Sequence, residues 1–314
     1  MSVEPTTTAP NSSPLSPDGL CRQHATTLQE LFDGTLTPRA AATKLSKITI
    51  PNPRIRRHRY AYSIQLLFEN IISSLHTHPH RVETVADLII SISQLPPIWA
   101  KSDPGAPKHF IPDENTCIWD DDGSTFARIL NDKWERECQN RYPVMTTVTS
   151  LIFASPNTDL TIPTAETTKR QAVIDGFVAV NELVATLILY DEERFKYHLF
   201  LLWSLRSALE RPSWVVMAGD RKAILECYVK AAAKLIEIAG PEIRHWEHEY
   251  EHGPLVGDPG SGGDLWQGKG GFCKDRWELW RRRFGELSVE EGLGAEARGC
   301  AMRAGEMMAE IDDG

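Results

Sequence analysis

The feature that most constrains the fold is the recurrence of apolar residues at intervals of three and four, in segments separated by proline and glycine. Between residues 54 and 75 these intervals join Tyr60, Ile64, Leu67, Phe68, Ile71 and Leu75. That spacing puts the side chains on one face of an α-helix, whereas a half-buried strand needs strict alternation. No stretch alternates convincingly. The sequence therefore predicts an all-α fold, a compact multi-helix array of antiparallel helix hairpins with long loops.

Breakers and caps set the expected helix boundaries. Gly34 is expected to end a first helix, and Thr37-Pro38 to begin a second that runs to Lys47. Further helices are predicted over residues 54–75, 82–95, 124–140, 144–153, 164–189, 192–209 and 214–239, then one reaching His252, an aromatic helix to Gly285, and a last helix from a Ser288 capping box to Ile311. Long loops are expected over residues 96–121, 156–163 and 253–271.

The first residues differ in composition from the rest of the 314-residue chain. Residues 1–18 are rich in Ser, Thr and Pro and poor in large apolar groups, so burial cannot offset their ordering entropy. We predict a disordered tail over residues 1–18 and a single all-helical domain over residues 19–314.

Charge and cysteine usage narrow the function classes. A net charge of −9 argues against a protein that coats nucleic acid, because that task needs a basic face. The six cysteines show no C-x-x-C spacing and are expected to be free thiols of a reducing compartment. The N-terminus lacks the features of a signal peptide, and the most apolar run, residues 183–190, is too short to span a bilayer. We expect a cytoplasmic or nuclear protein with no nucleic-acid partner and no membrane.

The sharpest chemical motif is an H-E-x-x-H match formed by His248, Glu249 and His252. On a helix, His248 and His252 would lie on one face as two zinc ligands, and Glu249 would act as the base. However, Gly253-Pro254 ends the expected helix at the second histidine, and the apolar face is expected at Ile243, Trp246 and Tyr250. A solvated polar face is therefore the preferred interpretation, with a zinc metallohydrolase as the alternative.

Two further patterns suggest phosphate contacts. The first nearly matches the pattern of a phosphate-binding loop, at Gly263-x-x-x-x-Gly268-Lys269-Gly270. However, no strand precedes it, and Gly270 occupies the position at which that pattern has a Ser or Thr hydroxyl. The basic runs at residues 54–59 and 281–283 are expected to be acid-paired or solvated helix faces, given the acidic chain.

The aromatic helix itself has a plain interpretation. Trp277, Trp280 and Phe284 form one stripe at helical spacing, which is typical of a core-facing surface. Trp266 and Lys269 precede this helix and are not explained by the stripe. Small-molecule binding near Trp266 and Trp280 therefore stays open, with Trp266, Lys269, Trp277 and Trp280 as candidate binding residues.

The same stretch carries a family resemblance. It rests on Leu265-Trp266-Gln267-Gly268-Lys269, Gly271-Phe272, Arg276-Trp277, Trp280 and Phe284, with supporting matches at residues 31–41, 126–128 and 134. On these residues the chain resembles a family of fungal proteins known as domain of unknown function 3632, over roughly residues 20–290. The resemblance implies an intracellular helical protein and no particular reaction, and the H-E-x-x-H positions are not part of it.

These observations favour a non-catalytic protein-interaction or scaffold domain without a cofactor. A zinc metallohydrolase and a small-molecule binder are the two alternatives from other classes. The identity of any protein partner and the oligomeric state are left open by the sequence.

Overall fold

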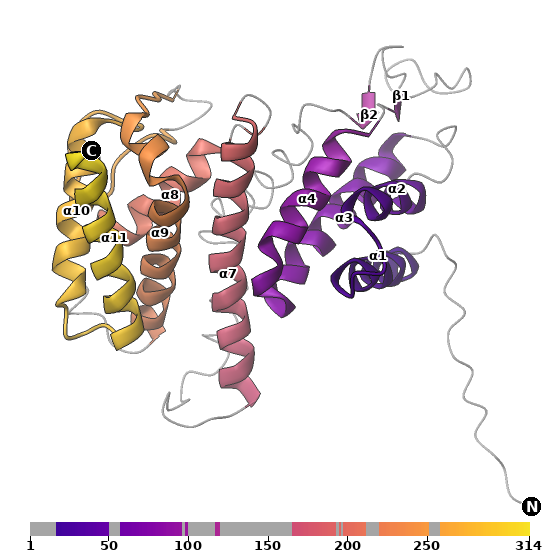
Figure 1. The fold of residues 1–314 in the computed structure, drawn as a ribbon, viewed down its shortest axis with the longest axis horizontal. Coiled ribbons are helices and arrows are strands. Elements are labelled where there is room, and N and C mark those ends of the chain that lie inside the picture. Colours follow the sequence, from indigo (N-terminus) through magenta and orange to yellow (C-terminus); the bar gives the residue numbers. More distant parts are fainter. Residues whose placement is uncertain are drawn as a thin grey trace, which may run out of the picture. The chain divides into compact units, whose positions relative to one another are not determined.

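The computed structural model describes residues 17–49, 57–95, 98–99, 117–119, 165–192, 195, 197–211, 220–250 and 258–314. Its helices are α1 (Pro17–Phe32), α2 (Pro38–Thr49), α3 (Arg57–Thr77), the 3-10 helix η1 (Pro79–Arg81), α4 (Val82–Ser93), α7 (Ala165–Tyr190), α8 (His198–Leu209), α9 (Asp220–His245), α10 (Lys274–Ser288) and α11 (Ala295–Asp313) (Figure 1). The predicted all-α class is confirmed. The described residues add one short antiparallel pair of strands, β1 (Ile98–Trp99) and β2 (Cys117–Trp119).

The chain divides into two compact units, and the division falls within α3 and α4. The N-terminal unit comprises residues 1–71 and 91–121, and the C-terminal unit comprises residues 72–90 and 122–314. The expectation of one domain over residues 19–314 stays a prediction. The predicted tail over residues 1–18 lies almost wholly outside the described residues, and α1 begins at Pro17.

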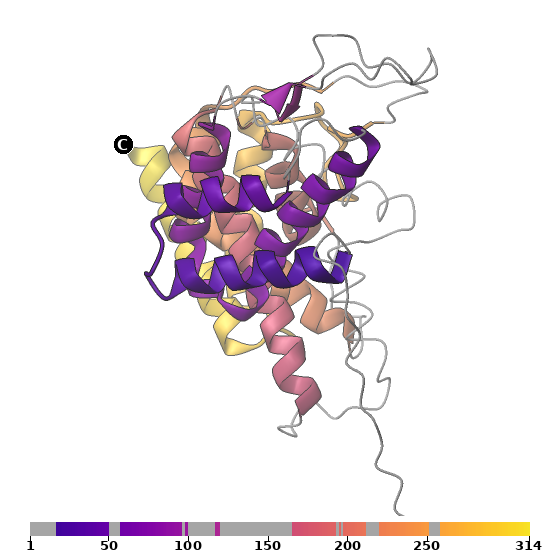
Figure 2. The ribbon, with the colours of Figure 1, turned by 90° about the vertical axis from the view of Figure 1, so that its right-hand side faces the viewer.

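In the N-terminal unit, α1 and α2 lie side by side (Figure 2). The turn between them contains Gly34 at φ 75°, a backbone conformation that glycine adopts without strain. The Thr37 hydroxyl accepts a hydrogen bond of 3.3 Å from the Ala40 amide and so caps α2, as the sequence predicts. His24 is fully buried in α1, between the hydroxyl of Thr49 and the side-chain amide of Asn70.

The C-terminal unit contains α7 to α11, and its contacts fix the relative directions of three helices. Lys230 of α9 pairs with Glu296 near the start of α11. Arg244, further along α9, pairs with Asp312 near the end of α11, so the two helices run parallel. The Trp277 indole donates to Asp312 at 3.0 Å, while Phe284 lies beside Gly305, so α10 runs antiparallel to α11. These three helices stand together in Figure 1.

Three predicted helix boundaries are wrong. Ser288 does not cap the last helix, because it is the final residue of α10; the Glu226 carboxylate of α9 instead accepts from the amide of Gly294, the residue before α11, at 2.6 Å. Helix α8 begins at His198 rather than near residue 192. Helix α9 ends at His245, after a kink at Ala239 next to Pro241, and does not reach His252.

Several predictions fall outside the described residues, among them the helices over residues 124–140 and 144–153. The loop predicted over residues 156–163 lies there too.

Among the helices that are described, none combines the length and apolar character needed to cross a bilayer. Four of the cysteines, Cys21, Cys227, Cys273 and Cys300, are free thiols as expected.

Candidate functional site

The glycine-rich loop before α10 is organised by a buried ion pair between Glu210 and Arg276. Glu210 follows the last turn of α8, and Arg276 lies in the first turn of α10. The guanidinium donates from Nε to one carboxylate oxygen at 2.6 Å and from an Nη atom to the other at 2.9 Å, and both side chains are fully buried. A bidentate pair of this kind fixes the relative orientation of the two side chains as well as pairing their charges.

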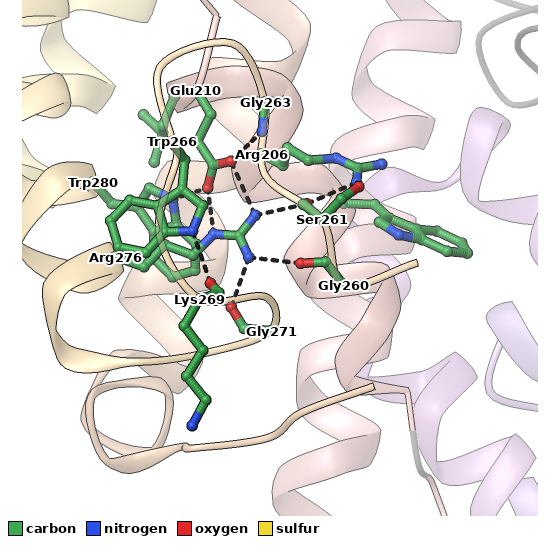
Figure 3. Close-up of polar contacts among 12 residues, drawn as sticks. Arg206, Glu210, Gly260, Ser261, Gly263, Trp266, Lys269, Gly271, Arg276 and Trp280 are labelled. Atoms are coloured by element: carbon green, nitrogen blue, oxygen red, sulfur yellow. Dashed lines mark hydrogen bonds and ion pairs between the residues drawn. The ribbon is translucent and has the colours of Figure 1, made fainter. Parts of the chain in front are cut away.

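The Arg276 guanidinium also binds backbone carbonyl groups of the glycine-rich loop. It donates to the carbonyl oxygens of Gly260, Ser261 and Gly271 at 3.0, 3.0 and 2.7 Å (Figure 3). The Glu210 carboxylate accepts in turn from the Trp280 indole and from the Gly263 amide, both at 2.7 Å. Because every polar atom of this buried pair has a partner, the pair joins α8, α10 and residues 260–271 into one rigid piece.

Two glycines are required by this close packing. A Cβ atom at Gly263 would lie 2.5 Å from the Glu210 carbonyl oxygen. At Gly271 the backbone has φ 77°, and a Cβ would lie 1.9 Å from the His248 carbonyl oxygen. The loop therefore uses its glycines to bring backbone against backbone.

The aromatic stripe of α10 packs into the core, as predicted. Trp277 and Trp280 are each 1% exposed, and Phe284 is fully buried. Burying three rings of this size contributes on the order of 2–3 kcal/mol each before entropy is counted. A small molecule that contacted Trp277 or Trp280 would have to displace this packing; their role as binding residues stays a prediction.

Trp266 and Lys269, the other two candidate binding residues, lie in the loop itself. The half-buried Trp266 donates its indole N–H to the Lys269 carbonyl at 2.8 Å, and its ring centroid lies 5.8 Å from the Arg276 guanidinium carbon. The Lys269 ammonium is exposed and pairs with Glu249, and this hydrogen bond raises the pKa of the lysine. The Trp280 ring centroid lies 5.7 Å from the same guanidinium carbon, so both tryptophans pack against the buried ion pair.

The structure separates His248 and Glu249, the two described residues of the H-E-x-x-H match. The helix on which that motif depends ends at His245, and residues 246–250 are not helical. His248 turns toward His198 and Glu192, whereas Glu249 pairs with Lys269 on the exposed face. His252 lies outside the described residues.

The basic run of α10 is acid-paired as expected, since Arg281 pairs with Asp312, and Arg282 and Arg283 pair with Glu286. Arg281 and Arg282 are exposed, but the Arg283 side chain is only 12% exposed. It donates to the carbonyl oxygens of Leu209 and Arg211 at 3.1 and 3.3 Å. Leu209 is the last residue of α8, and the final carbonyls of a helix lack partners within it, so Arg283 supports that terminus.

A pocket of about 640 Å³ lies within the C-terminal unit, between η1, α7, α9 and α11. Its lining residues are Pro79, His80, Asp175, Val178, Ala179, Glu182, Lys230, Ala233, Lys234, Glu237, Glu296, Cys300, Arg303, Ala304 and Met307. The volume falls within the range typical of ligand sites. Sequence reasoning missed this pocket, because its lining residues are spread over segments that only the fold brings together.

Most charged groups of the pocket already have partners. Lys230 pairs with Glu296 at 2.6 Å, Lys234 pairs with Glu237 at 2.8 Å, and Asp175 accepts from Gln171. The carboxylate of Glu182 is half-buried and makes no hydrogen bond or ion pair within the described part of the chain. Burial raises its pKa; Lys234 lowers it again, and Glu237 and Glu83 raise it further.

Comparison with known proteins gives the family. Residues 68–284, more than half of the chain, match the family described as a protein of unknown function, DUF3632. The chain belongs to this family, and the match contains both residues of the buried ion pair and most of the pocket's lining residues. Searches of curated proteins and of solved structures gave no match.

Proposed function

We propose that this chain is a non-catalytic binding module of the cytoplasm or nucleus, whose pocket between α7, α9 and α11 receives a basic side chain from a protein partner. The observation that carries the proposal is Glu182. Its carboxylate lies in a pocket of about 640 Å³ without a hydrogen-bonding or ion-pairing partner in the described residues. A half-buried acid without a partner is costly, and an ammonium or guanidinium group beside it would remove that cost.

The electrostatic surroundings favour a cation over an anion. The two pocket lysines are engaged by Glu296 and Glu237, so neither offers an unpaired charge for an anion. Around Glu182, Lys234 lowers the pKa of the carboxyl while the two acids Glu237 and Glu83 raise it, and the lysine is itself already paired with Glu237.

The apolar part of the lining favours a side chain over a bare ion. Val178, Ala179, Ala233, Ala304 and Met307 line the pocket beside the charged groups. The methylene stem of a lysine or arginine would pack on these groups while its charged head reaches Glu182. A protein partner supplies this combination together with the surrounding contacts that a specific interface needs.

The proposal is tested by peptide selection. A phage library of helical peptides is selected against the full-length chain, and the recovered peptides are measured against Glu182→Gln by calorimetry. We expect a shared Lys or Arg beside apolar residues, and at least about tenfold weaker binding to the variant, because a hydrogen bond to a charged group contributes about 1.5–3 kcal/mol.

Glu306→Gln is the matched control, since Glu306 is an exposed acid of α11 outside the pocket lining. It removes the same charge and should leave affinity unchanged. Peptides without a basic residue, or peptides that bind both variants equally well, would contradict the proposal.

A further inference from the structure

We propose that Glu192, His198 and His248 form a site for one divalent transition-metal ion of the zinc class. Their side-chain ligand atoms all lie within 4.8 Å of one another. The three residues come from the segment after α7, the first position of α8 and the segment after α9, all within the C-terminal unit. This site is independent of the Glu182 pocket.

The distances within the cluster suit tetrahedral coordination. The Glu192 Oε1 atom lies 2.9 Å from His198 Nε2 and 3.4 Å from His248 Nε2. With zinc–nitrogen and zinc–oxygen bonds of about 2.0–2.2 Å, tetrahedral geometry places neighbouring ligand atoms roughly 3.3–3.5 Å apart. The cluster therefore needs only small side-chain movements to enclose an ion.

Hydrogen bonding alone leaves this cluster incomplete. His198 and Glu192 share one hydrogen bond, but His248 Nε2 is buried and forms none, although it lies 3.4 Å from the carboxylate. A buried ring nitrogen without a partner is unfavourable. A metal ion would satisfy all three groups at once, whereas the hydrogen-bonded trio satisfies two.

Both imidazoles are held in place by surrounding aromatic rings. The His198 ring lies edge-on to Trp246 with ring centroids 4.5 Å apart, and Trp246 packs edge-on against Phe272 at 5.1 Å. The His248 carbonyl accepts from the Phe272 amide at 2.9 Å, so its backbone is anchored to the glycine-rich loop. Ligands fixed in this way lose little freedom on binding an ion.

The chemistry of the donors selects the class of metal. Two imidazoles and one carboxylate suit zinc and its first-row neighbours, whereas magnesium and calcium prefer oxygen donors throughout. The Glu192 side chain is 50% exposed, so solvent can reach the ion and supply the remaining ligand. A bound ion would clamp the segment after α9 onto the start of α8, which gives the site a structural role.

The test uses the full-length chain, stripped with a chelator, kept reduced, and titrated with zinc chloride by calorimetry. Cobalt absorption in the visible range reports the coordination geometry independently. We expect one zinc per chain, an increase in thermal unfolding temperature on binding, and tetrahedral cobalt bands. His198→Ala and His248→Ala should each weaken affinity by at least about 100-fold, and Glu192→Gln by at least about tenfold.

His245→Ala removes an exposed histidine at the end of α9 and should not change binding. His252→Ala separates this site from the H-E-x-x-H alternative: zinc that depends on His252 and not on His198 would overturn the proposal. So would zinc that depends on none of the three residues, or no zinc bound at micromolar metal. If His198→Ala fails to fold by circular dichroism, the partly exposed Glu192→Gln decides the question.

Discussion

Replacing Arg276 with methionine is expected to lower the free energy of unfolding of the C-terminal unit by about 3–5 kcal/mol, the cost typical of breaking a buried ion pair from one side. The change removes two bonds to Glu210, at 2.6 and 2.9 Å, and three to loop carbonyls, at 2.7–3.0 Å. It leaves a carboxylate buried without its counter-charge. The retained donors from Trp280 and Gly263 keep the loss from exceeding this range.

Two variants on the same helix sharpen the prediction. Arg282→Met removes an arginine whose side chain is 68% exposed and whose nearest acid is 3.8 Å away, so its effect should stay within about 0.5 kcal/mol. Arg276→Lys keeps the charge but not the planar fork, and should still cost about 2 kcal/mol or more.

Urea unfolding followed by tryptophan fluorescence measures these differences, because the ring centroids of Trp266 and Trp280 lie 5.8 and 5.7 Å from the guanidinium carbon. A double-mutant cycle with Glu210→Met should show the double variant to be more stable than the sum of the single changes by about 1–3 kcal/mol. The reasoning is refuted if Arg276→Met is as mild as Arg282→Met, or if the cycle shows no coupling.

Three further predictions concern other parts of the chain. Burial lowers the pKa of His24 from 6.5 to about 4, so the unfolded state binds a proton at a higher pH than the folded state. The free energy of unfolding should therefore fall by about 2 kcal/mol between pH 7 and 5, and His24→Gln should abolish this fall when unfolding is measured by denaturant titration at each pH. Gly271→Ala should destabilise by at least about 2 kcal/mol, since its Cβ would lie 1.9 Å from a carbonyl oxygen. Gly285→Ala, in the last turn of α10 with nothing within 4 Å of the new Cβ, should instead stabilise by up to about 0.5–1 kcal/mol. Burial raises the pKa of the Cys227 thiol, so alkylation mapped by mass spectrometry should leave Cys227 unmodified in the native chain while Cys21, Cys273 and Cys300 react; equal labelling would contradict its burial.

Helical periodicity predicted most of the described fold, because a helix that is buried on one face repeats its apolar residues every three or four positions. The expected helix over residues 164–189 corresponds to α7 (Ala165–Tyr190), and the stripe of Trp277, Trp280 and Phe284 is core. Periodicity could not place the end of α9, because that end is decided by tertiary hydrogen bonds. The backbone at His248 pairs with Phe272, which replaces the helical bonds that the sequence pattern alone suggests.

The sites were harder to predict because their members are far apart in sequence. Arg276 carried a local signal: it precedes Trp280 by four residues and therefore lies on the apolar face of α10, where an arginine needs a partner. Nothing local identifies Glu210, which lies 66 residues earlier. The same holds for Glu192, His198 and His248, which only the fold brings within 4.8 Å.

The central claim, that Glu182 receives a basic side chain, is tested most directly by calorimetry on a selected peptide. Binding is measured for the wild-type chain and Glu182→Gln, each with the peptide and with its basic residue replaced by norleucine. We predict a coupling free energy of about 1.5–3 kcal/mol between the two positions. Effects that add within about 0.5 kcal/mol would show that the two side chains do not meet, and would contradict the proposed function.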